Sequence, residues 1–206
     1  MLKKILITVA LPVVLAACAS TQSISTSDKA KVKAVRLNGS VGVPQRVYYL
    51  GPGGANALAF GAIGGALGAS GIEKERANFQ QQTGSGGTGI DRIVLEEVRD
   101  QFQKSGKFKL IDKDEPGAAI LDVTVTTYGF SIPHGFSSKL VPILGIRCEM
   151  KDSTGRIIWS DTENARPLGN PVDSIDADVI KTSVTAREQA WRAAAKALAA
   201  RMAVAY

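Results

Sequence analysis

The chain has 206 residues and a formal net charge of +6, and 45% of its residues are hydrophobic and 6% aromatic. This length suits one domain with a buried core and is short for two domains. The positive charge is mild, and the dense basic stripe with interleaved aromatic residues that is typical of nucleic-acid binders is absent, so we expect no nucleic-acid partner. A single histidine leaves little scope for metal sites or acid–base catalysis.

The amino terminus is organised like a bacterial export signal. A short basic start precedes an apolar run over residues 5–15, which at about eleven residues is too short for a hydrocarbon core that needs roughly 20. The run ends in Leu15-Ala16-Ala17-Cys18, which resembles the lipobox of bacterial prolipoproteins. The resemblance implies cleavage before Cys18, diacylglycerol on the cysteine sulfur, and a further acyl chain such as palmitate on the new amino terminus.

The lipid anchor implied by this motif is effectively permanent, because more than one acyl chain gives stable membrane binding. Ala19, in place of Asp, is similar to the outer-membrane sorting class and implies a position on the periplasmic leaflet of the outer membrane. The alternative is an ordinary signal peptide with a chance cysteine. We therefore predict a lipoprotein signal peptide over residues 1–17, a flexible Ser/Thr-rich tether over residues 18–33, and a single domain over residues 34–206.

The first part of this domain has strand-like content interrupted by glycine. Residues 32–37 and 41–50 are rich in Val, Tyr and Leu, and Gly51-Pro52-Gly53-Gly54 ends any strand there. A Gly/Ala-rich segment is predicted over residues 51–72. A Gly/Gln-rich linker is predicted over residues 80–89.

The Gly/Ala-rich segment carries small residues at helical spacing. On a helical wheel four of them form one narrow stripe, namely Ala57, Gly61, Gly64 and Gly68, and Gly65 lies beside it. Such a stripe lets a second helix approach closely, as in glycine-zipper packing. Three interpretations stay open, namely a loop or a helix packed on the protein's own sheet, a contact between subunits, and membrane insertion. A single crossing would separate everything after Glu73 from Cys18, so we favour a subunit contact over a membrane span.

The second half of the chain alternates between helix and strand patterns. Strands are predicted over residues 107–112 and 118–128, and a long helix over 184–203. An earlier helix ends at Ser105-Gly106, and its apolar positions recur at helical spacing: Ile90, Ile93, Val94, Val98 and Phe102. The strongest strand signal is a hairpin over residues 146–161, in which Ile146 and Trp159 face the core and Asp152-Ser153-Thr154-Gly155 forms the turn.

This order of elements predicts an α+β fold, a two-layer sandwich with a mostly antiparallel sheet and two helices on one face. The arrangement over residues 90–203 is similar to that of small periplasmic accessory lipoproteins, such as the amino-terminal domain of TolB and the lipoprotein partner of the lipopolysaccharide translocon. The resemblance is one of architecture and implies no shared activity.

The chain offers few groups for chemistry. Cys148 is the only cysteine left after lipidation of Cys18. We expect it to be a small buried apolar residue, and a reactive thiol is the alternative. His134 lies alone in a Gly/Pro/Ser loop over residues 131–141. No phosphate-binding loop, serine elbow or HExxH motif is present. We therefore expect no enzyme, no cofactor and no metal.

Two functions are compatible with these features. The favoured one is a lipid-anchored, non-enzymatic structural or assembly subunit of a cell-envelope complex, which associates with an envelope protein or with itself. The alternative is a periplasmic lipoprotein that binds a lipid, a glycan or a peptidoglycan fragment in a groove beside residues 131–141. A large apolar pocket would favour the second function.

Overall fold

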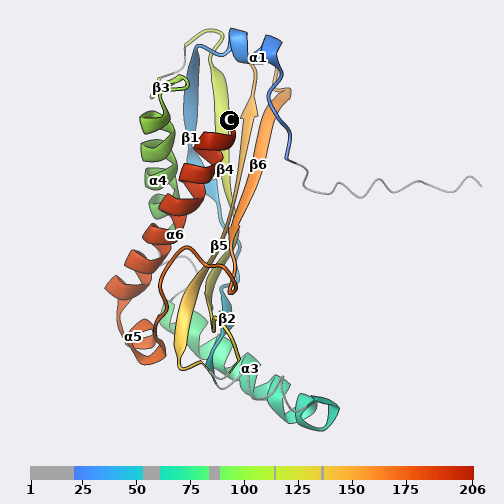
Figure 1. The fold of residues 1–206 in the computed structure, drawn as a ribbon, viewed down its shortest axis with the longest axis vertical. Coiled ribbons are helices and arrows are strands. Elements are labelled where there is room, and N and C mark those ends of the chain that lie inside the picture. Colours follow the sequence, from blue (N-terminus) through green and yellow to red (C-terminus); the bar gives the residue numbers. More distant parts are fainter. Residues whose placement is uncertain (1–20, 53–60, 84–88, 114, 136) are drawn as a thin grey trace, which may run out of the picture.

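The computed structural model describes residues 21–52, 61–83, 89–113, 115–135 and 137–206, and it shows a central sheet with helices packed on it (Figure 1). The strands are β1 (Ala34–Gly42), β2 (Tyr48–Leu50), β3 (Lys109–Ile111), β4 (Ala119–Ser131), β5 (Lys139–Lys151), β6 (Ile157–Ala165) and β7 (Ile175–Asp176). The helices are α1 (Thr26–Lys31), α3 (Gly61–Thr83), α4 (Ile90–Ser105), α5 (Ala177–Thr182) and α6 (Val184–Ala205).

The sheet is mixed, with the main order β3-β1-β4-β5-β6. β1 runs parallel to both β3 and β4, and β2 also pairs in parallel with β4. Among the named strands of the described ranges, the pairs β4–β5, β5–β6 and β5–β7 are antiparallel. The prediction of a mostly antiparallel sheet is therefore wrong. The strands β1 and β4 are parallel because the connection between them passes through α4. Such a crossover brings the chain back in the same direction.

The hairpin between β5 and β6 confirms the strongest strand prediction. Met150 pairs with Trp159, and the Asp152 carboxylate accepts hydrogen bonds from the backbone N–H of Thr154 at 3.0 Å and of Arg156 at 3.1 Å. Gly155 takes a left-handed conformation with φ 85°, which a glycine adopts without steric cost. The turn chemistry therefore sets the register of the hairpin.

The two long helices α4 and α6 confirm the predicted helices. All five apolar residues of the α4 pattern are buried, and Gly106 ends the helix with φ 62°. The apolar face of α6, which includes Trp191 and Leu198, is also buried. Figure 1 shows α4 and α6 lying side by side along the sheet, where α4 packs on β1 and β3 and α6 packs on β5 and β6.

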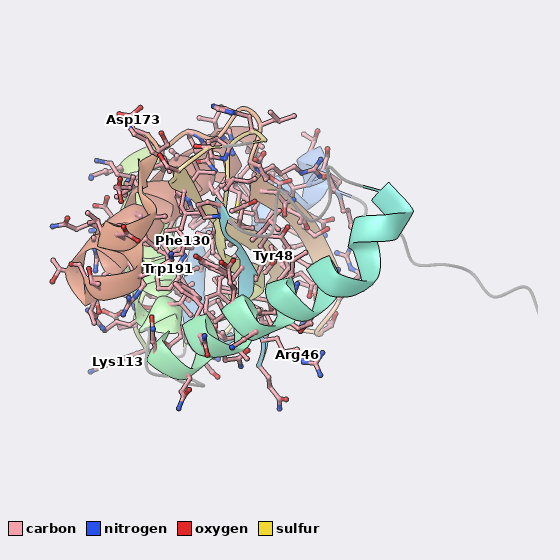
Figure 2. The ribbon with its side chains drawn as sticks, turned by 90° about the horizontal axis from the view of Figure 1, so that it is seen from below. Arg46, Tyr48, Lys113, Phe130, Asp173 and Trp191 are labelled. Atoms are coloured by element: carbon pink, nitrogen blue, oxygen red, sulfur yellow. The ribbon has the colours of Figure 1, made fainter. Side chains whose placement is uncertain are left out.

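A close contact holds β2 against the lower end of β4. Gly129 has φ 149°, and any side chain there would collide with the backbone of Tyr48. The Gly129 carbonyl accepts a hydrogen bond from Trp191 Nε1 at 3.0 Å, and the rings of Phe130 and Trp191 are 5.1 Å apart. Seen from below, α3 crosses this end of the molecule, with Tyr48, Phe130 and Trp191 behind it (Figure 2).

The segments predicted as a tether and as a linker contain regular structure where they are described. Within the predicted tether over residues 18–33, Gln22 forms a β-bridge and Thr26–Lys31 form the helix α1. Residues 80–83 of the predicted linker over 80–89 are the last part of α3. Among the helices so described, none has both the length and the apolar character that a membrane crossing requires.

Candidate functional site

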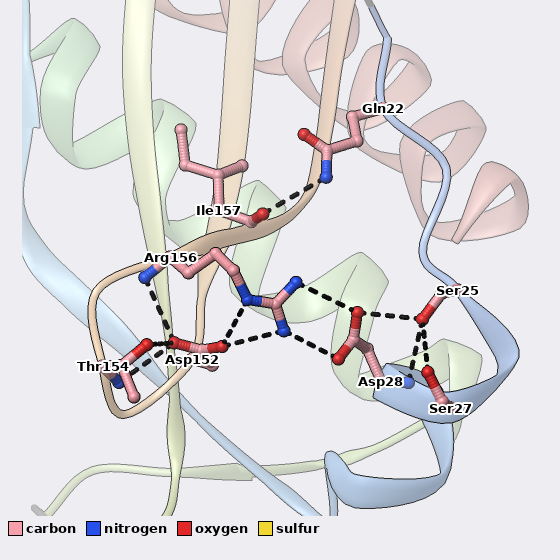
Figure 3. A network of polar contacts seen from close by, with 8 residues as sticks. All are labelled: Gln22, Ser25, Ser27, Asp28, Asp152, Thr154, Arg156 and Ile157. Carbon is pink, nitrogen blue, oxygen red and sulfur yellow. Dashed lines mark hydrogen bonds and ion pairs between the residues drawn. The ribbon is translucent and has the colours of Figure 1, made fainter.

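The segment that follows the predicted lipobox docks on the edge of the sheet. The backbone N–H of Gln22 donates to the Ser160 carbonyl at 2.8 Å, and the N–H of Ser160 donates back at 3.0 Å. The Gln22 side chain adds a hydrogen bond to the Ile157 carbonyl at 3.2 Å (Figure 3). Gln22 therefore extends the sheet by one antiparallel partner of the edge strand β6.

An ion-pair network fixes α1 to the β5–β6 turn (Figure 3). The Arg156 guanidinium donates to both carboxylate oxygens of Asp28, at 2.8 and 3.3 Å, and to Asp152 Oδ2 at 3.1 Å. Ser25 caps α1 by accepting from the backbone N–H of Asp28 at 3.0 Å. The hydrogen bonds from Arg156 and then Ser25 lower the pKa of Asp28. The geometry is the two-pronged one that makes arginine a specific partner of carboxylates.

Residues 21–33 also contact Tyr206, the last residue of the sequence. Lys29 Nζ donates to the Tyr206 carbonyl oxygen at 3.2 Å and lies 5.4 Å from the centre of the Tyr206 ring. A further contact is made by Thr21, whose hydroxyl donates to Asp161 Oδ1 at 3.4 Å. Two residues, Ala19 and Ser20, separate Thr21 from Cys18, so the three Cα–Cα steps between them span at most about 11 Å.

The predicted site residues fall into two groups. Cys18 and Ala57 lie outside the described residues. Gly61, Gly64, Gly65 and Gly68 lie on the first turns of α3, so the backbone there is helical. Their role as a contact surface stays a prediction.

The two other residues singled out from the sequence have ordinary surroundings. Cys148 is fully buried and free, and burial followed by the nearby Asp161 raises the pKa of its thiol, as expected of a small buried hydrophobe. His134 is exposed, with its Nδ1 3.2 Å from the Gly135 carbonyl. In the described parts of the chain, no group of three His, Cys, Asp or Glu side chains could hold a metal ion.

A cavity that the sequence did not suggest lies between β2, α3 and α5. It has a volume of about 240 Å³ and is lined by six residues: Tyr49, Glu75, Asn78, Phe79, Gln82 and Lys181. Its apolar wall is a stacked aromatic pair, Tyr49 and Phe79, with ring centres 4.5 Å apart. We call this the Tyr49 cavity.

Two oxygens beside this cavity have no hydrogen-bond partner among the described residues. They are Tyr49 Oη and Glu75 Oε2, and both are buried. A Cβ atom placed on Gly51 would lie 2.7 Å from the first and 2.8 Å from the second, so the two oxygens flank the same point. Burial, and then the charges of Glu75 and Asp178, raise the pKa of Tyr49 to about 12, so its hydroxyl is protonated at neutral pH.

The Tyr49 cavity combines three segments that are far apart in the sequence, which is why periodicity could not reveal it. In the sequence, the one indication of the cavity is Phe79, a large aromatic residue that directly precedes the predicted linker over residues 80–89. Phe79 is 2% exposed, so it is part of the core.

Comparisons with known proteins give structural likeness only. No protein-family model matches the chain, and a search of curated proteins gives no significant match. The chain is similar to the PelC dodecamer from Paraburkholderia phytofirmans, with TM-score 0.42, 11% identity, and coverage of 90% of this chain and 93% of that chain.

Two further solved structures are similar over about half of the chain. One is a protein from Xanthomonas campestris described under the DUF330 family, with TM-score 0.39, 17% identity, and coverage of 56% of this chain and 62% of that chain. The other is a minor lipoprotein from Acinetobacter baumannii, with TM-score 0.40, 15% identity, and coverage of 54% and 79% respectively. All of these TM-scores are below 0.5, so no function is transferred from them.

Proposed function

We propose that this chain is a lipid-anchored outer-membrane lipoprotein that faces the periplasm and serves as a non-enzymatic structural or assembly subunit of a cell-envelope complex. The observation that carries the proposal is the docked segment over residues 21–33. It begins three residues after Cys18, so the folded body is held close to the lipid anchor.

A short, fixed connection suits an assembly subunit better than a protein that must reach for its partner. A free tether of fifteen residues would reach about 50 Å when extended, but the docked segment leaves only about 11 Å of chain between Thr21 and Cys18. The edge strand β6 therefore lies near the membrane, and the orientation of the body is restricted. Restricted orientation lowers the entropy that is lost when neighbouring subunits associate.

The helix α3 supplies the surface for association. Figure 1 shows α3 projecting beyond the lower end of the sheet, with its first turns furthest from the core. These turns carry Gly61, Gly64, Gly65 and Gly68 at the spacing that allows close approach of a second helix. The partner is a second copy of the chain or another envelope protein.

The experiment is cross-linking in intact cells of a Gly64→Leu variant that keeps Cys18. Leucine favours a helix over glycine by close to 1 kcal/mol, so the helix itself is strengthened while close packing at Gly64 is blocked. We expect cross-linked species to disappear. Ala66→Leu, which lies on the opposite side of the helical wheel, is the matched control and should cross-link as the parent does.

Cross-linking of the Gly64→Leu protein at the parental level would contradict the assembly role. Tighter membrane association of this variant would instead support insertion of the segment into the membrane. A deletion of residues 51–88 is less informative, because it would remove the buried side chain of Phe79.

One observation favours the alternative function, a ligand-binding lipoprotein. Tyr49 lines a cavity, and the next residue, Leu50, pairs with Ser131 at the end of β4, where the loop begins.

A further inference from the structure

We propose that the end of the molecule around the last turn of α6 is a membrane-contact surface that binds the phosphate head groups of anionic phospholipids. We call it the lysine surface, after four exposed residues: Lys29, Lys33, Lys107 and Lys109. The inference rests on the proposed lipid anchor and adds which end of the folded body faces the membrane. It is independent of assembly through α3, which lies at the opposite end from α1 (Figure 1).

Two of these lysines are held against the end of α6. Lys29 Nζ donates to the Tyr206 carbonyl oxygen at 3.2 Å, and Lys107 Nζ donates to the Val204 carbonyl oxygen at 2.7 Å. Each ammonium group has three N–H donors, so both groups keep donors for another acceptor. Segments that are far apart in the sequence therefore place two positive charges on the same turn of α6.

The other two lysines lie next to this pair, where β3 begins to run beside β1. The backbone N–H of Lys109 donates to the Lys33 carbonyl at 3.4 Å. Between Lys107 and Lys109, the ring of Phe108 packs edge-to-face on that of Tyr206, with ring centres 4.9 Å apart. The four lysines thus surround one end of the hydrophobic core.

Among the described residues, none of the four lysines forms an ion pair with a carboxylate, so their charges are open to an external anion. Carboxylates of the neighbouring elements have other basic partners, namely Asp28 and Asp152 with Arg156, Asp100 with Lys104, and Asp112 with Arg99. Lys31 lies beside Asp28 and adds a positive charge to the two carboxylates that share Arg156. Glu115, in the turn before β4, is exposed and forms no ion pair with a described residue.

A hollow of about 480 Å³ opens between α1 and the end of α6. The Lys29 side chain and the hydroxyl-bearing residues Ser23 and Thr26 line it, together with the apolar Ile24. A phosphate diester offers only acceptor oxygens and a negative charge, and ammonium and hydroxyl groups are the donors that suit it. The hollow therefore has the chemistry of a head-group site.

A second hollow, of about 380 Å³, lies on the other side of the same turn, between the ends of α4 and α6. Lys104 and Lys107 line it together with Ala203 and Val204, and Val204 is 78% exposed. Lysine side chains beside exposed apolar groups are typical of surfaces that lie in the membrane interface, because the stem contacts apolar groups while the ammonium stays in water.

The predicted anchor brings this surface within reach of the lipids. Ser23, which lines the first hollow, is five residues after Cys18, so their Cα atoms are at most about 19 Å apart. Basic residues attract anionic lipids within a Debye length of the membrane, about 8 Å at physiological ionic strength. An anchored body that turns the lysine surface toward the membrane satisfies both distances.

The first test measures the reactivity of individual lysines in the lipidated protein. The protein is reconstituted into vesicles of phosphatidylcholine, with or without about 30% phosphatidylglycerol, and labelled with a water-soluble acylating reagent that mass spectrometry localises. We expect the four lysines to react at least about fivefold more slowly in the anionic vesicles. Lys74 on α3 and Lys139 at the start of β5 are exposed internal controls and should react equally in both. At about 1 M salt, where the Debye length is about 3 Å, the difference should vanish.

The second test removes the anchor. A chain without residues 1–17 that carries Cys18→Ser should keep its fold, because its hydrophobic core lies between Val35 and Tyr206. We expect it to sediment with phosphatidylglycerol vesicles at about millimolar lipid and not with phosphatidylcholine alone.

A matched pair of double variants assigns this binding to the lysine surface. Lys33→Gln with Lys109→Gln should weaken it by about tenfold or more, since each lysine contributes about fivefold. Lys74→Gln with Lys139→Gln changes the net charge equally and should bind as the parent does. Melting curves confirm that both double variants are folded.

Three results would overturn the proposal. They are equal reactivity of the four lysines in both kinds of vesicle, no sedimentation of the unlipidated chain with anionic vesicles, and equal weakening by the two double variants. Failure of the wild-type protein to carry lipid and float with either vesicle would contradict the anchor instead. In that event the sedimentation test still decides whether the lysine surface binds anionic lipid.

Discussion

Single buried side chains determine much of the packing in this fold. The ring of Trp159 meets those of Phe102 and Tyr206 at centre distances of 5.9 and 5.6 Å, in edge-to-face geometry. This cluster ties β6 to α4 and to the carboxyl terminus. Ile146 on β5 is fully buried in the same hydrophobic core. Such contacts contribute beyond the area that they bury, because aromatic rings in this geometry attract one another.

Truncation of either core residue of the hairpin should therefore destabilise the protein strongly. We expect Trp159→Ala and Ile146→Ala each to lower the free energy of unfolding by about 2–5 kcal/mol, through lost burial and the cavity that remains. Denaturant titration measures the change. Leu168→Ala is the control, because Leu168 is 80% exposed. Unchanged midpoints for both core variants would show that the hairpin face is assigned wrongly.

At the scale of elements, the docking of residues 21–33 onto β6 and the β5–β6 turn is the feature with a direct functional meaning. It uses one backbone pairing, at Gln22, and a network of charged side chains around Arg156. The network lies at the surface, where the Arg156 side chain is 56% exposed, so salt and pH should act on the docked segment before they act on the core.

Acid should release this segment. The pKa of Asp28 is lowered in the folded protein, so its contribution is present above the ordinary value of 3.8 and is lost as pH falls through the lowered value. The pKa of Asp152 is lowered as well, which gives the same sign. We expect the protection factors of residues 21–33 against hydrogen exchange to fall below about pH 4.

A charge-neutral variant separates this effect from general acid unfolding. Asp28→Asn should weaken protection of the segment already at neutral pH and reduce its acid dependence, while α4 and α6 stay protected. Asp173→Asn, at an exposed loop position, should behave as the parent does. The same acid response in the parent and in Asp28→Asn would rule out the Asp28–Arg156 pair as its origin.

At the scale of the whole molecule, the proposed anchor and the docked segment would act in series. In the proposed arrangement the acyl chains hold Cys18 at the membrane, and the docked segment holds the body close to Cys18. Loss of the proposed anchor should release a folded protein, because buried side chains between Val35 and Tyr206 form a hydrophobic core.

The corresponding prediction concerns the cysteine itself. Cys18→Ser should give an unlipidated or uncleaved product that no longer fractionates with outer membranes, since only the cysteine sulfur accepts the lipid. Flotation of membranes followed by detection of the protein measures this result. Normal cleavage and membrane fractionation of the variant would contradict the lipoprotein assignment.

Local patterns were sufficient for the hairpin and for the two long helices. The β5–β6 hairpin follows from alternating burial and from the turn residues Asp152 and Gly155, whose preferences act over a few residues. The helix α4 follows from apolar spacing and a terminal Gly106, and α6 from a stripe around Trp191. The lipobox is likewise a local motif, which is why the sequence by itself predicts an anchor at Cys18.

Only the tertiary structure decided the features that join distant segments. The parallel pairing of β1 with β4 depends on the path through α4, and the docking of α1 depends on Asp28 meeting Arg156, 128 residues further along the chain. The polar residues 21–33 resemble a tether because the partner that orders them lies far away in the sequence. The Tyr49 cavity likewise forms where β2, α3 and α5 meet. A periodic pattern in the sequence does not indicate which strand a distant helix will cover, so the cavity could not be predicted.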